Sequence, residues 1–393
     1  MRVPMSDFDA ERYAERASDA TGLDDFGDDS WRGGLERLLA SLDSEAALND
    51  LGRTIVDGEI VTYLTNRLGV IAERRAHPEI ARGTVAPPIV IVGQGRTGTT
   101  ILYDLLAQDP ATRVPLTWEV AAPCPPPETA TYDTDPRIAE NEATSAMVDL
   151  VIPGFRAMHP LGPLLAQECV AITASDFRSM IFPVQYRVPS YLRWLLFEAD
   201  MAPAYRWHRK FLQHLQSRHP AERWVIKSPG HIWCLAALLA EYPDALLVQT
   251  HRDPLRIIAS LSSLVTTLRS LASDDGTLPE AADEFADCII EGLDRSVTAR
   301  LDGTIPDGRV IDVQFDAFMA DPFATIRAVY ERLDLEFTGI AETRMREFLA
   351  THPQDRYGKH AYTFAATELD EGALRERARR YQEYFAVPSE TLP

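Results

Sequence analysis

Short apolar runs along the chain alternate with longer segments in which apolar residues recur every three to four positions. The short runs are rich in β-branched residues, which is typical of strands buried on both faces of a parallel sheet. They lie near residues 88–92, 113–117, 223–227, 245–250 and 308–313. Parallel strands need helical crossovers between them. The pattern therefore predicts an α/β fold, with a central parallel sheet flanked by helices and right-handed connections.

Helical spacing also dominates regions outside these strands. Residues 1–80 are predicted to form an N-terminal helical cap, and residues 81–393 an α/β domain. A helical insert is expected at about residues 120–220. A C-terminal helical segment is expected at about residues 340–390, and it includes an amphipathic helix predicted over 368–384.

The first predicted strand leads directly into a glycine-rich loop, residues 93–100 (GQGRTGTT), which is followed by helical spacing. Strand, glycine loop and helix together form a P-loop-type phosphate site, because glycines let backbone N–H groups turn inward and the helix start adds partial positive charge. Arg96 adds a guanidinium and three threonines add hydroxyls. The expected phosphate-contacting residues are Gly95, Arg96, Thr97, Gly98, Thr99 and Thr100.

This loop differs from that of an ordinary nucleotide triphosphatase. Such enzymes carry lysine directly after the last glycine, whereas here that position is Thr99 and the cation is Arg96. A dinucleotide-binding loop would be followed about 20 residues later by an acidic residue. Glu119 lies near that distance, so spacing alone does not exclude this alternative.

Two further predicted strands end in a cation. The strand near 223–227 ends at Lys227, and the strand near 245–250 is followed by Arg252. Asp253 is predicted to cap the next helix and Pro254 to begin it, which puts Ser260 nearly two turns into that helix. Residues 206–256 contain 8 Lys and Arg against 4 acidic residues. An anion site is therefore predicted at these strand ends.

The rest of the chain is acidic, and its formal charge of −20 over 393 residues argues against nucleic acid or anionic lipid as a partner. Four cysteines without a CxxC pair predict neither a zinc site nor a redox motif. The longest aliphatic run, residues 235–240, is too short for a membrane span, and the first residues lack the apolar core of a signal peptide. We therefore expect a cytoplasmic protein without a metal.

Taken together, residues 95–100, residues 227–231 (KSPGH) and Arg252-Asp-Pro with Ser260 resemble the sulfotransferases that use 3′-phosphoadenylyl sulfate (PAPS). The likeness is to the bacterial branch with PRTGTT-like and KSPxH-like blocks. It implies that the glycine loop holds the 5′-phosphosulfate and that Arg252 and Ser260 bind the 3′-phosphate. It also implies sulfuryl transfer to a hydroxyl or phenol acceptor with release of adenosine 3′,5′-bisphosphate (PAP). The basic loop at Lys359 and His360 is implied to close over the nucleotide.

Glu119 is the candidate general base, because related carbohydrate and tyrosyl-protein enzymes carry a glutamate at the end of the strand after the loop helix. Arg96 and Lys227 would neutralise charge on the transferred group and the leaving phosphate. His231 is a second candidate base. The animal cytosolic enzymes have their catalytic histidine where this chain has Pro229, so that assignment does not transfer.

Other assignments stay open at this point. Glu168 and His159 are candidates to line an acceptor pocket or simply to pack helices. The alternatives in function are an ATP-dependent P-loop phosphotransferase, which would need lysine after Gly98, and a non-catalytic PAP-binding protein. The expected acceptor is a small molecule, apolar or aromatic, but the sequence determines neither its identity nor the oligomeric state.

Overall fold

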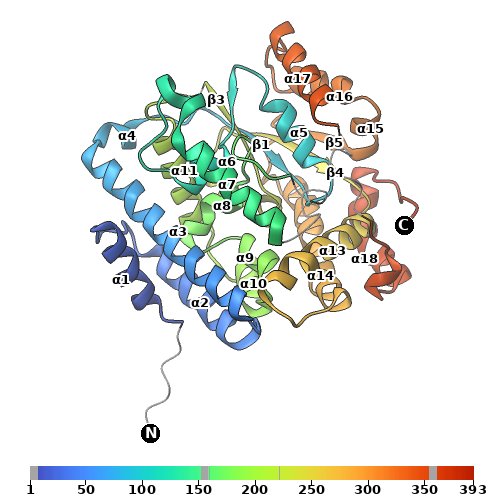
Figure 1. The fold of residues 1–393 in the computed structure, drawn as a ribbon. Helices are drawn as coiled ribbons and strands as arrows, with labels where there is room; N and C mark the ends of the chain where they lie inside the picture. Colours follow the sequence, from blue (N-terminus) through green and yellow to red (C-terminus); the bar gives the residue numbers. More distant parts are fainter. Residues whose placement is uncertain (1–7, 152–157, 159, 221, 354–360) are drawn as a thin grey trace.

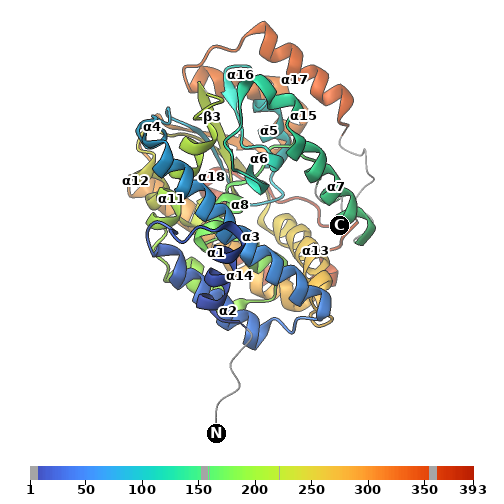
Figure 2. The same cartoon turned by 60° about the vertical axis from the view of Figure 1, so that its left-hand side comes forward.

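A computed structural model describes residues 8–151, 158, 160–220, 222–353 and 361–393 (Figures 1 and 2). Five strands of this part form one sheet in the order β2-β3-β1-β4-β5. Every neighbouring pair is parallel. The strands are β1 (Ile89–Val92), β2 (Thr112–Arg113), β3 (Arg223–Lys227), β4 (Leu246–His251) and β5 (Val310–Gln314). The predicted α/β fold with a central parallel sheet is confirmed.

Strand β1 lies at the centre of the sheet and all four of its residues are buried. Ile89 and Ile91 belong to the core on one face, beneath three helices. These are α5 (Thr99–Leu106), α16 (Pro322–Arg332) and α17 (Gly339–Thr351). Val90 and Val92 belong to the core on the other face, beneath α11 (Ala202–Leu215) and α12 (Leu235–Glu241). Because both faces are covered, the strand reads as a continuous apolar run.

Helices fill the N-terminal segment, and α1 to α3 lie together on the side of the molecule opposite α15 to α17 (Figures 1 and 2). The bounds are α1 (Ala10–Thr21), α2 (Ser30–Glu45), α3 (Asp50–Ala76) and α4 (Pro78–Arg82). Their core is shared with Phe177 and Tyr191 from the insert and with Ala272. The domain boundary at residue 80 stays a prediction.

The remaining helices belong to the insert and to the later part of the chain. The insert contains α6 (Thr117–Ala121), η1 (Thr129–Thr134), α7 (Pro136–Val151), α8 (Cys169–Thr173), η3 (Ala174–Asp176), α9 (Ile181–Gln185) and α10 (Pro189–Phe197). The later part contains η4 (Pro229–Trp233), α13 (Pro254–Ala272), α14 (Leu278–Leu301), α15 (Phe315–Ala320), η5 (Ala365–Thr367) and α18 (Glu371–Phe385).

The strand predicted at 113–117 is shorter than expected. Strand β2 ends at Arg113, and α6 begins at Thr117. Pro115 lies between them and has no N–H to donate to a ladder, while Leu116 makes an isolated antiparallel bridge to Ala166. Glu119 is therefore in the first turn of a helix and not at the end of a strand.

Helix α13 is, in the described part of the chain, the one helix long and apolar enough to cross a membrane by length and composition. Half of its most apolar window is buried inside the protein. It packs against α14, α3, α9 and α18. These contacts are those of a core helix, which accounts for its apolar composition.

Candidate active site

The strand order brings three loops of interest together. β1 lies between β3 and β4 in a parallel sheet, so the carboxyl ends of all three strands meet at one edge. The glycine loop follows β1, Lys227 ends β3, and Arg252 follows β4. Ligands of open α/β sheets bind at this edge, where the connections leave in different directions.

The glycine loop has backbone angles that few side chains tolerate. Gly93 has φ 144° and Gly98 has φ 84°. A Cβ atom on Gly93 would lie 2.3 Å from the Thr250 Oγ1 atom, so the loop packs directly against β4. The Thr97 hydroxyl shares a 2.7 Å hydrogen bond with that same oxygen and donates one of 2.7 Å to the Gln94 carbonyl. Thr97 thus braces the loop through its hydroxyl, and its predicted contact with a phosphate stays a prediction.

The start of α5 faces this loop without a cap. Gly98 is the N-cap residue, and no side chain in the described part of the chain accepts a hydrogen bond there from the first turn. Thr99 and Thr100 form that turn. The first backbone N–H groups of a helix have no partner within the helix and favour an anion. The start of α5 is therefore compatible with the predicted phosphate site, which stays a prediction.

The structure brings Arg96, Arg252 and Ser260 together. The Arg96 Nε group donates to the Ser260 hydroxyl at 2.9 Å, and the Arg252 Nη1 group donates to the Arg96 carbonyl at 2.9 Å. Burial lowers the pKa of Arg96, and the charge of Arg252 lowers it further, while Tyr362 opposes both effects. A largely buried Arg96 guanidinium that also experiences the Arg252 charge favours the arrival of an anion.

Arg252 has additional partners that the sequence did not indicate. Its Nε and Nη2 groups donate to the two carboxylate oxygens of Glu390 at 2.8 and 3.0 Å. Arg256, one helical turn further on, places its Nε atom 3.2 Å from the same carboxylate. The spacing of four residues could have identified Arg256. Nothing local could have identified Glu390, which lies far away in the sequence.

Lys227 is buried next to an acidic side chain. Its ammonium group forms an ion pair with the Glu168 carboxylate and lies 5.7 Å from the centroid of the Tyr103 ring. The Tyr103 hydroxyl donates to the Gln167 carbonyl at 3.1 Å, which fixes the loop that carries Glu168. The Lys227 side chain is 3% exposed and that of Glu168 17% exposed. Glu168 is therefore a carboxylate that a ligand could reach.

A second acidic residue, Asp104 on α5, also interacts with Lys227. Burial raises the pKa of Asp104 to about 7, although the Lys227 charge opposes the shift. A carboxyl group of this kind changes protonation near neutral pH. The sequence analysis did not single it out, although it lies one turn after Thr100 on the same face of the helix.

Glu119 lies in a fully buried ion pair. Arg113 donates to its Oε1 atom, and the backbone N–H of Leu116 donates to its Oε2 atom at 2.8 Å. Its side chain has no exposed surface. Burial raises its pKa, while Arg113, the Leu116 N–H and Tyr132 oppose the shift. The arrangement fixes the start of α6, and the role of Glu119 as a base stays a prediction.

His231 is buried near Lys227. Its Nδ1 atom shares a 2.8 Å hydrogen bond with the Tyr205 hydroxyl, and its Nε2 atom has no hydrogen-bond partner among the described residues. Burial lowers its pKa to about 3, with smaller contributions from His208 and Lys227. His231 is therefore neutral at physiological pH, which is required of a base but also suits a core histidine.

Some candidates cannot be placed. Lys359, His360 and His159 lie outside the described residues. Within the described ranges, no group of three or more His, Cys, Asp and Glu side chains is arranged to hold a metal ion.

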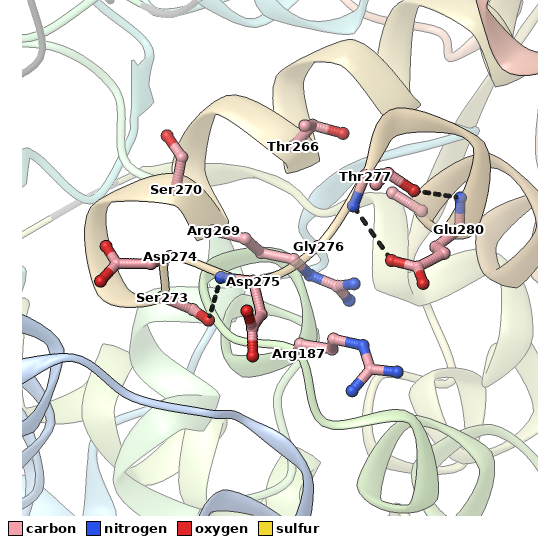
Figure 3. A pocket seen from close by; sticks show the side chains of 11 residues that line it. Arg187, Thr266, Arg269, Ser270, Ser273, Asp274, Asp275, Gly276, Thr277 and Glu280 are labelled. Atoms are coloured by element: carbon pink, nitrogen blue, oxygen red, sulfur yellow. Dashed lines mark hydrogen bonds between the residues drawn. The ribbon is translucent and has the colours of Figure 1, made fainter.

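A separate pocket lies at the far end of α13, where α14 begins (Figure 3). Its volume is about 60 Å³, and Arg187, Arg269 and Asp275 are among its lining residues. Thr277 and Glu280 cap the start of α14 reciprocally, as the dashed lines in Figure 3 show. This pocket holds a few waters at most and does not adjoin the glycine loop.

Known structures resemble this chain over almost its whole length. Sulfotransferase STF9 from Mycobacterium avium is 32% identical, with a TM-score of 0.88 over 97% of each chain. Sulfotransferase STF1 from Mycobacterium tuberculosis H37Rv is 30% identical, with a TM-score of 0.84 over 95% of this chain and 99% of that one.

A characterised relative and a family match agree with these structures. The omega-hydroxy-beta-dihydromenaquinone-9 sulfotransferase Stf3 of Mycobacterium tuberculosis is 25% identical over 288 residues, which are 70% of each chain. Residues 87–339, which include the glycine loop, Lys227 and Arg252, match the sulfotransferase family. On these grounds, together with the three cations at one sheet edge, the chain belongs to the sulfotransferase family.

Proposed function

We propose that this sulfotransferase transfers a sulfuryl group from PAPS to a hydroxyl or phenol group of a small acceptor and releases PAP. The observation that carries the proposal is the meeting of Arg96, Lys227 and Arg252 at one glycine loop. These cations follow three neighbouring strands of an otherwise acidic protein. Such a site fits a donor that bears several negative charges.

The residues present fit the two charged ends of PAPS. The glycine loop and the uncapped start of α5 would hold the 5′-phosphosulfate, with Thr99 and Thr100 in the first turn. Arg252 and Ser260 would bind the 3′-phosphate. The carboxylate of Glu390, held by the Nε and Nη2 groups of Arg252, supports an anion site at this position.

The reaction forms a bond between the acceptor oxygen and sulfur and breaks the bond between sulfur and the 5′-phosphate oxygen. Lys227 and Arg96 would neutralise charge on the transferred group and the leaving phosphate. The acceptor proton must pass to a base, and we assign this role to Glu168, which is partly exposed and touches Lys227. A positioned base contributes about 10²–10⁴-fold. Glu119 and His231 remain the competing candidates.

For the acceptor, we propose a neutral, largely apolar or aromatic alcohol or phenol. The Mycobacterium tuberculosis relative is named for a hydroxylated menaquinone derivative, which has this chemistry. The acidic excess of this chain, with a formal charge of −20, would disfavour anionic acceptors. A cytoplasmic location stays a prediction.

The test combines a transfer assay with a binding measurement. Labelled PAPS is incubated with the protein and a panel of neutral alcohols and phenols, and PAP binding is measured by calorimetry. We expect labelled product from at least one apolar acceptor without added Mg²⁺. Binding of PAP without transfer to any acceptor would favour a non-catalytic PAP-binding protein. Transfer of phosphate from ATP that requires Mg²⁺ would favour the phosphotransferase.

The 3′-phosphate assignment has its own variant. Arg252→Gln is expected to weaken PAP at least tenfold more than adenosine 5′-phosphosulfate, because only PAP carries the 3′-phosphate. Arg309→Gln is the matched control, since Arg309 is a partly exposed arginine just before β5 that pairs with Asp244 and lies away from the strand ends that carry the site. Equal weakening of both ligands would refute the role of Arg252.

A further inference from the structure

The carboxylate of Glu390 lies where the proposed function requires a phosphate. It accepts hydrogen bonds from the Nε and Nη2 groups of Arg252 at 2.8 and 3.0 Å, one on each oxygen. Two oxygens on one planar guanidinium form the same fork that a phosphate forms. The Arg256 Nε atom lies 3.2 Å from the same carboxylate. One internal acid therefore engages two of the cations at this edge of the sheet.

Arg252, Arg256 and Ser260 recur every four residues at the start of α13 and form a polar stripe near Glu390. Arg252 lies one residue before Asp253, the N-cap residue of α13, and Arg256 and Ser260 follow within the helix at intervals of four residues. Residues four apart lie on the same face of a helix. Arg96 is joined to this stripe through the Ser260 hydroxyl. Glu390 thus lies beside a connected set of polar groups that fits an anion, and it is not part of an isolated ion pair.

The backbone around Glu390 is held in place. Its N–H donates to the Asp253 carboxylate at 2.7 Å, and Asp253 also caps α13 through the N–H of Leu255. Val387, three residues earlier, is buried in the core beside α18. At the other end, the carbonyl of Pro393 accepts from the Phe364 N–H at 3.1 Å. Because the tail is anchored on both sides, the Glu390 side chain can leave Arg252 only by rotating.

We propose, resting on the proposed function, that Glu390 is a specificity-determining residue whose carboxylate occupies the 3′-phosphate position until a 3′-phosphorylated nucleotide displaces it. A carboxylate and a phosphate cannot share Arg252, because two like charges at contact distance repel strongly. When a 3′-phosphate displaces the carboxylate, Arg252 loses its ion pair with Glu390 and forms one with the phosphate. A nucleotide with a 3′-hydroxyl cannot form such an ion pair. The Glu390 carboxylate then stays on Arg252, and Arg252 contributes no binding energy to that nucleotide.

The test compares two ligands that differ in the 3′-phosphate alone. PAP and adenosine 5′-monophosphate are titrated by calorimetry into the wild type, Glu390→Gln and Glu390→Asp. The glutamine removes the charge, and the aspartate keeps the charge but shortens its reach. We expect both variants to bind PAP about tenfold more tightly, a change of about 1.4 kcal/mol. Affinity for adenosine 5′-monophosphate should change less than twofold.

The matched control is Glu383→Gln on α18, which changes the net charge equally at an exposed glutamate paired only loosely with Arg379. It should leave PAP affinity unchanged. PAP affinity that is unchanged or weaker in both Glu390 variants, while the wild type binds PAP, would overturn the role of Glu390 and leave the proposed function intact. Failure of the wild type and all variants to bind PAP would overturn the proposed function itself.

Discussion

Two ion pairs of this protein each join a glutamate to a buried cation, but the two glutamates differ in their exposure to solvent. Glu119 and Arg113 are 0% and 6% exposed, whereas Glu168 and Lys227 are 17% and 3% exposed. In the first pair, both carboxylate oxygens are taken by groups of the same short segment. In the second pair, one partner reaches the surface at the edge where the glycine loop lies. The comparison teaches that two carboxylates with a buried cationic partner can differ in whether a ligand reaches them, which favours Glu168 over Glu119 as the proposed base.

The largest effect is expected from breaking the buried pair. Glu119→Gln leaves the Arg113 charge buried without its counter-charge, which typically costs about 3–5 kcal/mol. Urea unfolding measures this loss, and PAP affinity of the folded variant should stay within twofold of the wild type. Glu128→Gln, which breaks the exposed pair with Arg218, is the control and should cost about 1 kcal/mol or less. Near-normal stability with loss of sulfuryl transfer would instead make Glu119 the base.

For the pair of Glu168 and Lys227, we expect the main effect on activity. Glu168→Gln is expected to lower kcat by about 10²–10⁴-fold, because the amide cannot take up the acceptor proton. Stability should fall as well, because the Lys227 ammonium group is 3% exposed and loses its counter-charge, although water at the partly solvated Glu168 position compensates part of this loss. Transfer assays and urea unfolding on the same preparation separate the two readouts. Glu198→Gln, at an exposed position after α10, controls for the change in charge. Wild-type turnover in Glu168→Gln would remove Glu168 as the base.

A smaller, pH-dependent effect is expected at Asp104, the other acid beside Lys227. Its pKa is raised to about 7 in the folded protein, from an ordinary value of 3.8. The unfolded chain therefore releases this proton at lower pH than the folded protein does. The stabilising contribution of the group is complete below about pH 4 and is lost as pH rises to about 7.

Asp104→Asn tests this sign, because asparagine mimics the protonated acid at every pH. Its stability relative to the wild type should increase by about 2–3 kcal/mol between pH 5 and pH 8, at about 1.4 kcal/mol for each pKa unit. Urea unfolding at the two pH values gives the difference. A difference that is independent of pH would mean that Asp104 is already ionised in the folded protein.

The sequence predicted much of the fold because its strongest patterns are local. A strand buried on both faces must be apolar throughout, so β1, β3 and β4 could be placed to within a residue or two. The cap of α13 was equally predictable, since Asp253 needs only the N–H of Leu255, two residues away. The end of β2 was misplaced because Pro115 ends the ladder before the apolar run ends.

The residues of the candidate site also fall into those that the sequence indicates and those that only the structure identifies. The sequence by itself determined the loop, its glycines and the three cations, because a phosphate site needs backbone N–H groups and positive charge within a few residues of a strand end. Only the tertiary structure decided which acids meet those cations. Glu168 reaches Lys227 across 59 positions, and Glu390 reaches Arg252 across 138. Contacts over such distances arise from how the sheet and its helices pack, and no local spacing encodes them.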